Sequence, residues 1–222
     1  MTGIIDIRGA AHLVREAGEL YLRGWLEGTS GNLSTRLDDA SDTILITTSG
    51  RSKGRLTESD TVPVSVRTGL PVQPDGPKPS AETSIHTAIY AADPRCGAVI
   101  HVHSPHATAV AVLAARASRT SVRFADLELI KGLGVVDPAS VRVPVLPNWP
   151  DVARIGTDVT NYLAESAAAP PVLLLAWHGV TAWGPSLEVA RNRLECLEAM
   201  CQLILLTASA APNTDLFQEG LL

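Results

Sequence analysis

The sequence predicts an α/β protein, in which helices and short strands alternate along the chain. Two observations indicate this class. Apolar residues recur at helical spacing near both ends of the chain, and short runs of apolar or β-branched residues lie between the helical patterns. The pattern leaves the order of the strands open, and it does not say which strands run parallel.

The first half of the chain carries the first two helical patterns. Leu13 and Ala17 lie on one face of the opening helix, and Gly28 marks its end. Further along, Ser80 stands at the start of a helical pattern and Glu82 falls in its first turn, where the helix dipole favours a carboxylate. The predicted elements are a helix over 7–26, strands over 43–48 and 62–66, a Pro- and Gly-rich loop over 69–79, and a helix over 80–91.

The second half continues the alternation. Pro105 suits the first turn of a helix. In the closing helix, Leu194 and Leu197 belong to the buried face, whereas Glu195 and Glu198 are expected on a solvated face with Glu188 and Arg191. The predicted elements are a strand ending at 101–103, a helix over 105–116, a strand over 141–146, a helix over 151–164, a strand over 172–177 and a helix over 185–207.

Length and composition favour one domain over 1–222, with a core of about 7–207 and a short C-terminal tail. The chain has no apolar stretch long enough to cross a bilayer and no signal-peptide pattern, so we expect a cytoplasmic protein without a membrane partner. The formal net charge of -5, with scattered basic residues, argues against nucleic acid as a partner. Its 3 cysteines form no CxxC pair and are expected to be free thiols.

The triplet His101-Val102-His103 is the first indication of chemistry. Side chains two apart on a strand leave the same face, so both imidazoles can bind one ion. A third histidine, His178, follows another apolar strand and precedes Gly179. Three neutral nitrogens with an open fourth position are typical of a catalytic zinc site.

Two Gly-containing turns, over 29–34 and 47–54, combine glycine with small hydroxyl residues. Such turns expose backbone N–H groups and hydroxyls, which bind phosphate without a large basic patch. The helix start at Ser80 is a third anion-binding element. A metal facing a phosphate pocket with carboxylates nearby suits chemistry on a phosphorylated sugar.

An ordered series of motifs resembles the class II aldolase/adducin family over roughly residues 7–207. Within the family, the ELIKG element and the PxxPN segment are most similar to the dehydratase branch. The motifs are Gly31-Asn32-Leu33-Ser34, Thr48-Ser49-Gly50, Pro79-Ser80-Ala81-Glu82, His101-Val102-His103-Ser104, Glu128-Leu129-Ile130-Lys131-Gly132, Val143-Pro144-Val145-Leu146-Pro147-Asn148, His178-Gly179-Val180 and Trp183-Gly184.

The resemblance implies a three-layer α/β/α fold with a central, largely antiparallel sheet. It also implies a homotetramer or a related ring assembly with active sites near subunit interfaces, and one Zn²⁺ per subunit bound by His101, His103 and His178. Ala81 stands where aldolases often carry a second serine, so the sequence departs from the family pattern at that phosphate contact. The residues matching the family's phosphate-contacting loops are Gly31, Asn32, Ser49, Gly50 and Ser80.

The function implied by the resemblance is zinc-dependent dehydration of 5-methylthioribulose 1-phosphate to 2,3-diketo-5-methylthiopentyl 1-phosphate, in methionine salvage. Glu128 is expected to be the principal acid/base, and Glu82 a pocket wall, auxiliary ligand or alternative base. Glu82 could instead serve only the helix start, and Glu128 could be a surface carboxylate. His86, four residues after Glu82, is expected to be a structural histidine, with partnership in the site as the alternative.

Two other functions remain open from the sequence. A class II sugar-phosphate aldolase would use the same metal to break a C–C bond in a fuculose, rhamnulose or ribulose phosphate. A non-catalytic adducin-like binding module would keep the fold without the chemistry. Retention of three histidines and two carboxylates disfavours the binding module.

Overall fold

The computed structural model describes residues 7–37, 42–166 and 168–210, and an eight-stranded sheet runs through them. The strand order is β3-β2-β1-β4-β8-β7-β6-β5. Neighbouring strands are antiparallel except β6 and β7, which are parallel. The strands are β1 Asn32–Arg36, β2 Thr43–Thr47, β3 Thr61–Ser65, β4 Ala98–Val102, β5 Ser121–Ala125, β6 Ser140–Leu146, β7 Val172–Leu175 and β8 Gly179–Gly184.

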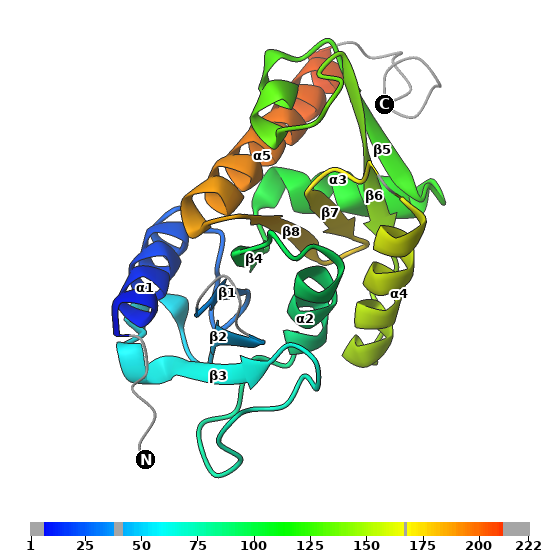
Figure 1. Ribbon diagram of the computed structural model, residues 1–222. Coiled ribbons are helices and arrows are strands. Elements are labelled where there is room, and N and C mark those ends of the chain that lie inside the picture. Colours follow the sequence, from blue (N-terminus) through cyan, green and yellow to red (C-terminus); the bar gives the residue numbers. More distant parts are fainter. Residues whose placement is uncertain (1–6, 38–41, 167, 211–222) are drawn as a thin grey trace.

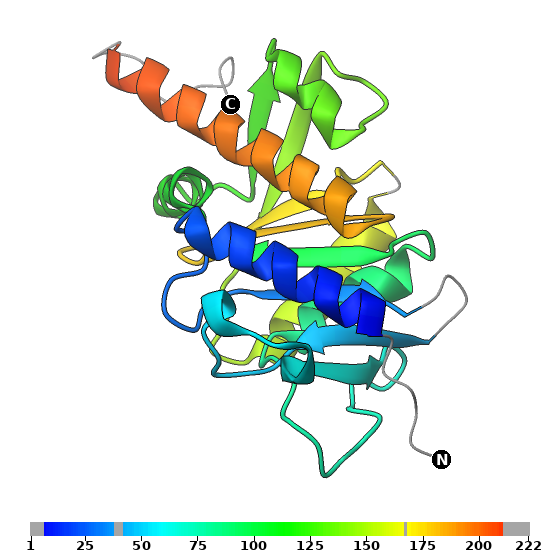
Figure 2. The ribbon, with the colours of Figure 1, turned by 90° about the vertical axis from the view of Figure 1, so that its left-hand side faces the viewer.

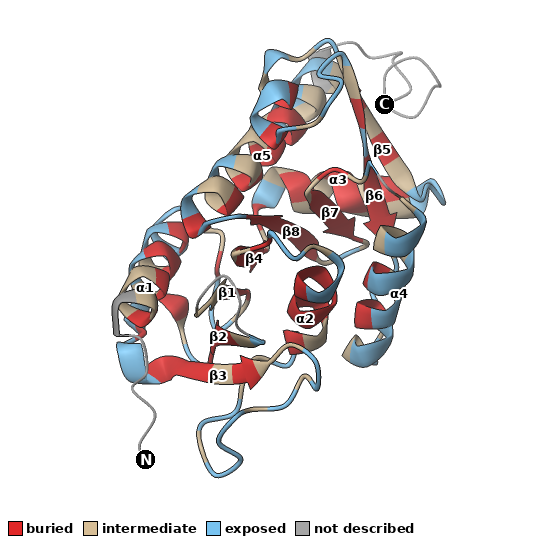
Figure 3. Cartoon of the chain, viewed as in Figure 1, coloured by how far each residue is buried: buried red, intermediate tan, exposed pale blue. Residues whose placement is uncertain are grey.

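Helices cover both faces of this sheet (Figures 1 and 2). One apolar cluster joins the sheet to α1 (Ile7–Leu22), α3 (Pro105–Arg116) and α5 (Leu187–Ala210). A second cluster joins the opposite face to α2 (Thr83–Ala92) and α4 (Val152–Glu165). The strands between them are largely buried (Figure 3). The predicted three-layer α/β/α fold with a largely antiparallel sheet is confirmed.

Three strands that the pattern did not predict complete the sheet, namely β1, β5 and β8. β1 was interpreted as part of a turn because its sequence, NLSTR, is mostly polar. Its Asn32 and Ser34 are nevertheless buried, because they face polar partners on α2 rather than solvent. A polar central strand lacks the apolar pattern that identifies strands from sequence.

Among the helix ends that differ from the prediction, two have a clear local cause. α1 ends at Leu22 rather than at 26, and Gly24 follows it with φ +71°, a left-handed conformation that ends helices. α2 begins at Thr83 rather than at Ser80. The residues before it instead form a turn, in which the Oγ of Ser80 accepts a hydrogen bond from the N–H of Glu82. Ser80 therefore caps the turn and not the helix.

Glu198 is the clearest correction to the predicted surface of α5, because it is 6% exposed rather than solvated. Its carboxylate accepts hydrogen bonds from the Oγ of Ser104 at 2.7 Å and from the backbone N–H groups of His106 at 2.9 Å and Ala107 at 2.8 Å. Glu198 thus caps the N-terminus of α3, directly after the strand that carries His101. No described helix is long and apolar enough to span a bilayer.

Candidate active site

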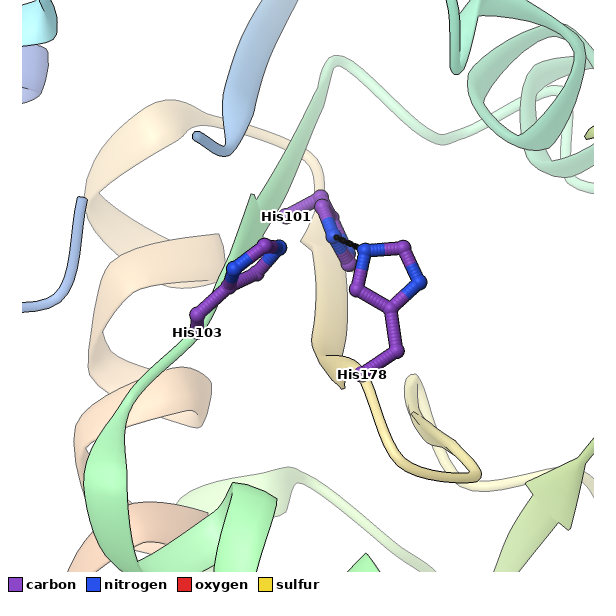
Figure 4. Close-up of side chains that lie close together, drawn as sticks. All are labelled: His101, His103 and His178. Carbon is purple, nitrogen blue, oxygen red and sulfur yellow. Dashed lines mark hydrogen bonds between the residues drawn. The ribbon is translucent and has the colours of Figure 1, made fainter. Parts of the chain in front are cut away.

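β4 lies at the centre of the sheet, paired with β1 and β8, and its alternation aims His101 at the α2 side. His103 follows two residues later. His178 lies in the turn between β7 and β8, after Trp177, which has φ +62°. The candidate ligand nitrogens of the three histidines lie within 4.8 Å of one another, and their rings converge on one space (Figure 4).

The geometry of the three imidazoles fits a tetrahedral metal. The Nε2 atoms of His101 and His178 are 3.3 Å apart, which matches the separation of about 3.3 Å expected for two nitrogens bound to one zinc ion. The Nε2 of His103 is buried without a hydrogen-bond partner among the described residues. A buried nitrogen without a partner is costly in protein and is satisfied by a metal.

The opposite ring nitrogens have their own partners. The Nδ1 of His178 lies 3.2 Å from the Oδ1 of Asn148, and the Nδ1 of His101 lies 3.0 Å from the Oγ1 of Thr181. Because an amide oxygen only accepts, the contact with Asn148 suits an Nδ1–H of His178, which is the tautomer whose Nε2 can bind a metal. This arrangement presents the Nε2 atoms as metal ligands.

Burial keeps His101 and His103 neutral. It lowers the pKa of His101 to about 4, against the opposing effect of nearby Glu82, and it lowers the pKa of His103 as well. Neutral imidazole is the form that binds metals, so both are ready to bind at neutral pH.

Glu82, the residue just before α2, faces the histidines. Its Oε1 lies 3.0 Å from the Nε2 of His178, and its Oε2 lies 3.6 Å from the Nε2 of His101. The Nδ2 of Asn32 donates a hydrogen bond of 2.5 Å to Oε2. Burial by itself raises the pKa of Glu82. Nearby His101 and His178 and the hydrogen bonds to the carboxylate lower this pKa by a larger amount, so the net shift is downward. An ionised carboxylate here can bind a metal or accept a proton.

A cavity of about 370 Å³ opens beside these groups. The turns over 29–34 and 47–54 meet there, because β1 and β2 pair and Thr48 bridges to Pro79. The cavity brings together the predicted phosphate-contacting residues with Glu82 and two of the histidines. Its lining includes Gly31, Asn32, Ser49, Gly50, Ser80, Glu82, His103 and His178.

Two further hydroxyls are ready to bind a ligand in this cavity. The Oγ of Ser30 and the Oγ1 of Thr48 line it and are buried without a hydrogen-bond partner among the described residues. Gly31 is required for this close packing, because its φ is +67° and an added Cβ would lie 2.8 Å from the carbonyl oxygen of His101.

Lys53 is a lining residue that the sequence interpretation missed. It is only 2% exposed, and its Nζ donates hydrogen bonds to the carbonyl oxygens of Thr29 at 2.8 Å and Arg51 at 3.0 Å. It therefore ties the two turns together and leaves one N–H for a ligand. Burial lowers its pKa, and Glu82 opposes that shift. The sequence feature that could have identified Lys53 is its position inside a Gly- and Ser-rich turn.

Glu128 lies outside the cavity of its own chain. It begins the 3₁₀ helix η3 (Glu128–Leu133), its side chain is 83% exposed, and its Oε1 accepts a hydrogen bond of 2.8 Å from Lys131. Of the two predicted carboxylates, the structure brings only Glu82 to the histidines of the same chain.

This fold and this histidine cluster define a class II aldolase-type protein. The chain belongs to the family described as Class II Aldolase and Adducin N-terminal domain, whose pattern matches residues 11–205. The chain is 40% identical to the methylthioribulose-1-phosphate dehydratase of Microcystis aeruginosa, over 90% of this chain and 96% of that protein. The predicted family and the predicted similarity to its dehydratase branch are both confirmed.

Other similar proteins fit the same family assignment. A probable bifunctional methylthioribose-1-phosphate isomerase/methylthioribulose-1-phosphate dehydratase of Nocardia farcinica is 46% identical over 98% of this chain, which spans 40% of that protein. Among solved structures, YgbL of Escherichia coli has a TM-score of 0.74 and 32% identity, covering 89% of this chain and 88% of that one. An L-fuculose 1-phosphate aldolase shares the fold, with a TM-score of 0.78 and 22% identity over 95% of this chain and 91% of its own.

Proposed function

We propose that this chain is a zinc-dependent hydro-lyase that converts 5-methylthioribulose 1-phosphate to 2,3-diketo-5-methylthiopentyl 1-phosphate, a step of methionine salvage. The observation that carries the proposal is one cavity that joins three converging histidines to a phosphate-type pocket. The reaction follows from relatives that carry this name and match over nearly their whole length.

The phosphate would bind in the pocket formed by the two turns. Lys53 supplies a buried positive charge, and Ser30 and Thr48 supply hydroxyl donors that have no other hydrogen-bond partner in the described part of the chain. Because the phosphate lies on the carbon next to the C2 ketone, anchoring it places the ketone near the histidines. Zinc bound by His101, His103 and His178 would stabilise the negative charge that develops on the carbonyl oxygen.

The reaction requires removal of the C3 proton and loss of the C4 hydroxyl as water, after which the enol tautomerises to the diketone. Glu128 remains our choice for the principal acid/base, and Glu82 for positioning, ligation or alternative proton transfer. Since Glu128 lies outside its own cavity, this role requires a neighbouring subunit to supply it. A homotetramer with sites near its interfaces would do so.

Substrate profiling tests the reaction. The zinc-loaded protein is incubated with 5-methylthioribulose 1-phosphate, and separately with fuculose and rhamnulose phosphates. We expect the diketone from the first and no cleavage of the others. Three-carbon products without the diketone would instead support an aldolase, and purified protein without tightly bound metal would support a binding module.

A subunit-mixing experiment tests the location of Glu128. Glu128→Gln and His178→Ala are each expected to be inactive, with zinc retained in Glu128→Gln. In mixed oligomers, a site with intact histidines can receive Glu128 from its neighbour, so activity should return to about a quarter of the wild-type value at most, by random assembly of pairs. Near-normal activity of Glu128→Gln alone would assign the acid/base role to Glu82, whereas no recovery in verified mixed oligomers would contradict the supply of Glu128 by a neighbouring subunit.

A further inference from the structure

A continuous line of buried polar side chains runs from the candidate site into the core between β1 and α2. The Nδ2 of Asn32 donates to Glu82 at 2.5 Å, and the Oδ1 of Asn32 lies 2.6 Å from the Nε2 of His86. The Nδ1 of His86 lies 2.7 Å from the Oγ of Ser34, which in turn lies 3.0 Å from the hydroxyl of Tyr90. The four inner residues are at most 2% exposed.

The periodicities of the two elements create this line. Asn32 and Ser34 are two apart on a strand, which separates them by about 6.6 Å. His86 and Tyr90 are four apart along α2, which separates them by about 6 Å, and Glu82 lies four residues before His86 at the N-cap. The two spacings match closely, so strand and helix side chains alternate along the line.

The hydrogen-bond chemistry gives the line one direction. The carboxylate of Glu82 only accepts, so the amide nitrogen of Asn32 must face it and the amide oxygen must face His86. His86 then carries its proton on Nε2, and its Nδ1 accepts from Ser34. The Ser34 oxygen is left to accept from the hydroxyl of Tyr90.

We propose that His86 is a positioning residue for the catalytic site: as a neutral Nε2–H tautomer backed by Ser34 and Tyr90, it fixes the amide of Asn32 and thereby the carboxylate of Glu82. His86 is not among the residues that line the cavity, and its two ring nitrogens face Asn32 and Ser34. Burial is also the main reason that its pKa falls to about 3, which keeps it neutral at neutral pH. The expected effect of His86 on turnover rests on the proposed function, whereas the expected tautomer of His86 is independent of it.

Nitrogen-15 NMR on the full-length protein with labelled histidine tests the tautomer without any substrate. The His86 signals are assigned as those missing from His86→Gln. We expect a single neutral Nε2–H form at pH 7, and loss of that uniform tautomer in Ser34→Ala. A protonated ring or an Nδ1–H form in the wild-type protein would overturn the direction of the line.

Turnover tests the positioning role. Gln can donate to Asn32 and accept from Ser34, whereas Leu can do neither, so His86→Gln should rescue what His86→Leu loses. We expect kcat to be lower by about tenfold or more in His86→Leu, and to be close to the wild-type value in His86→Gln. The samples compared have the same folded fraction and the same zinc content. Equal kcat values for the two variants would overturn the role, even with the tautomer as expected.

Discussion

The amide oxygen of Asn148 lies 3.2 Å from the Nδ1 of His178, 30 residues further along the chain. Asn148 follows β6 and His178 follows β7, the parallel pair of the described sheet. Because the carboxyl ends of parallel strands meet at one edge, the PxxPN segment and the third histidine come together there. The segment thus orients a candidate metal ligand.

Removing this partner should weaken metal binding. In Asn148→Ala we expect zinc affinity to fall about 10- to 100-fold, because the ring of His178 loses the acceptor that fixes its tautomer. Asn148→Asp keeps an acceptor oxygen and is the matched control, with affinity close to that of the wild-type protein. Competition titration with a chromophoric chelator measures both, and unchanged affinity in Asn148→Ala would remove Asn148 from the site.

Lys53 should determine affinity for the phosphate. Lys53→Met removes a buried charge from the cavity, so we expect KM for the phosphorylated ketose and the inhibition constant of inorganic phosphate to rise together, by about tenfold or more. Lys53→Arg, which keeps the charge, should lose less. Arg95→Met removes an equal charge from a side chain that is 92% exposed and should change neither constant. Unaltered phosphate inhibition in correctly folded Lys53→Met would refute the assignment.

His86 should make the protein sensitive to acid. Its folded pKa of about 3 is below the unfolded value of about 6.5, so between these values the unfolded chain binds more protons and stability rises with pH. Lowering the pH from 7 to 5 should therefore cost about 2 kcal/mol in free energy of unfolding from this residue. Urea unfolding of wild-type protein and His86→Gln at both pH values isolates that contribution, and an identical pH dependence would contradict it.

Glu198 should matter for stability, unlike its neighbours on α5. Glu198→Ala leaves the Oγ of Ser104 and two backbone N–H groups of α3 without their acceptor, and we expect a loss of about 2 to 4 kcal/mol. The exposed Glu188 on the same helix is the control, because its replacement by Ala should cost less than about 0.5 kcal/mol. Urea unfolding compares them, and equal effects would contradict the capping role.

The sequence predicted most elements that have a regular apolar pattern, although it missed β5, whose side chains alternate, and β1, which has no such pattern. α3 was predicted with its observed bounds, because Pro105 marks its start and apolar residues continue to its end. β1 was missed because two of its three buried side chains, Asn32 and Ser34, are polar and their partners Glu82 and His86 lie 50 or more residues away. Glu198 was placed in solvent for a similar reason, since its partners belong to another helix.

The sequence by itself determined the residue types of the candidate site: three histidines after apolar runs, two turns of Gly and hydroxyl residues, and two carboxylates. The tertiary structure alone decided which of them meet. Strand pairing brings His101 beside Asn32 and places His178 at the same edge, whereas Glu128 lies exposed on η3. Contacts between residues distant in sequence depend on packing and register, which local periodicity does not encode.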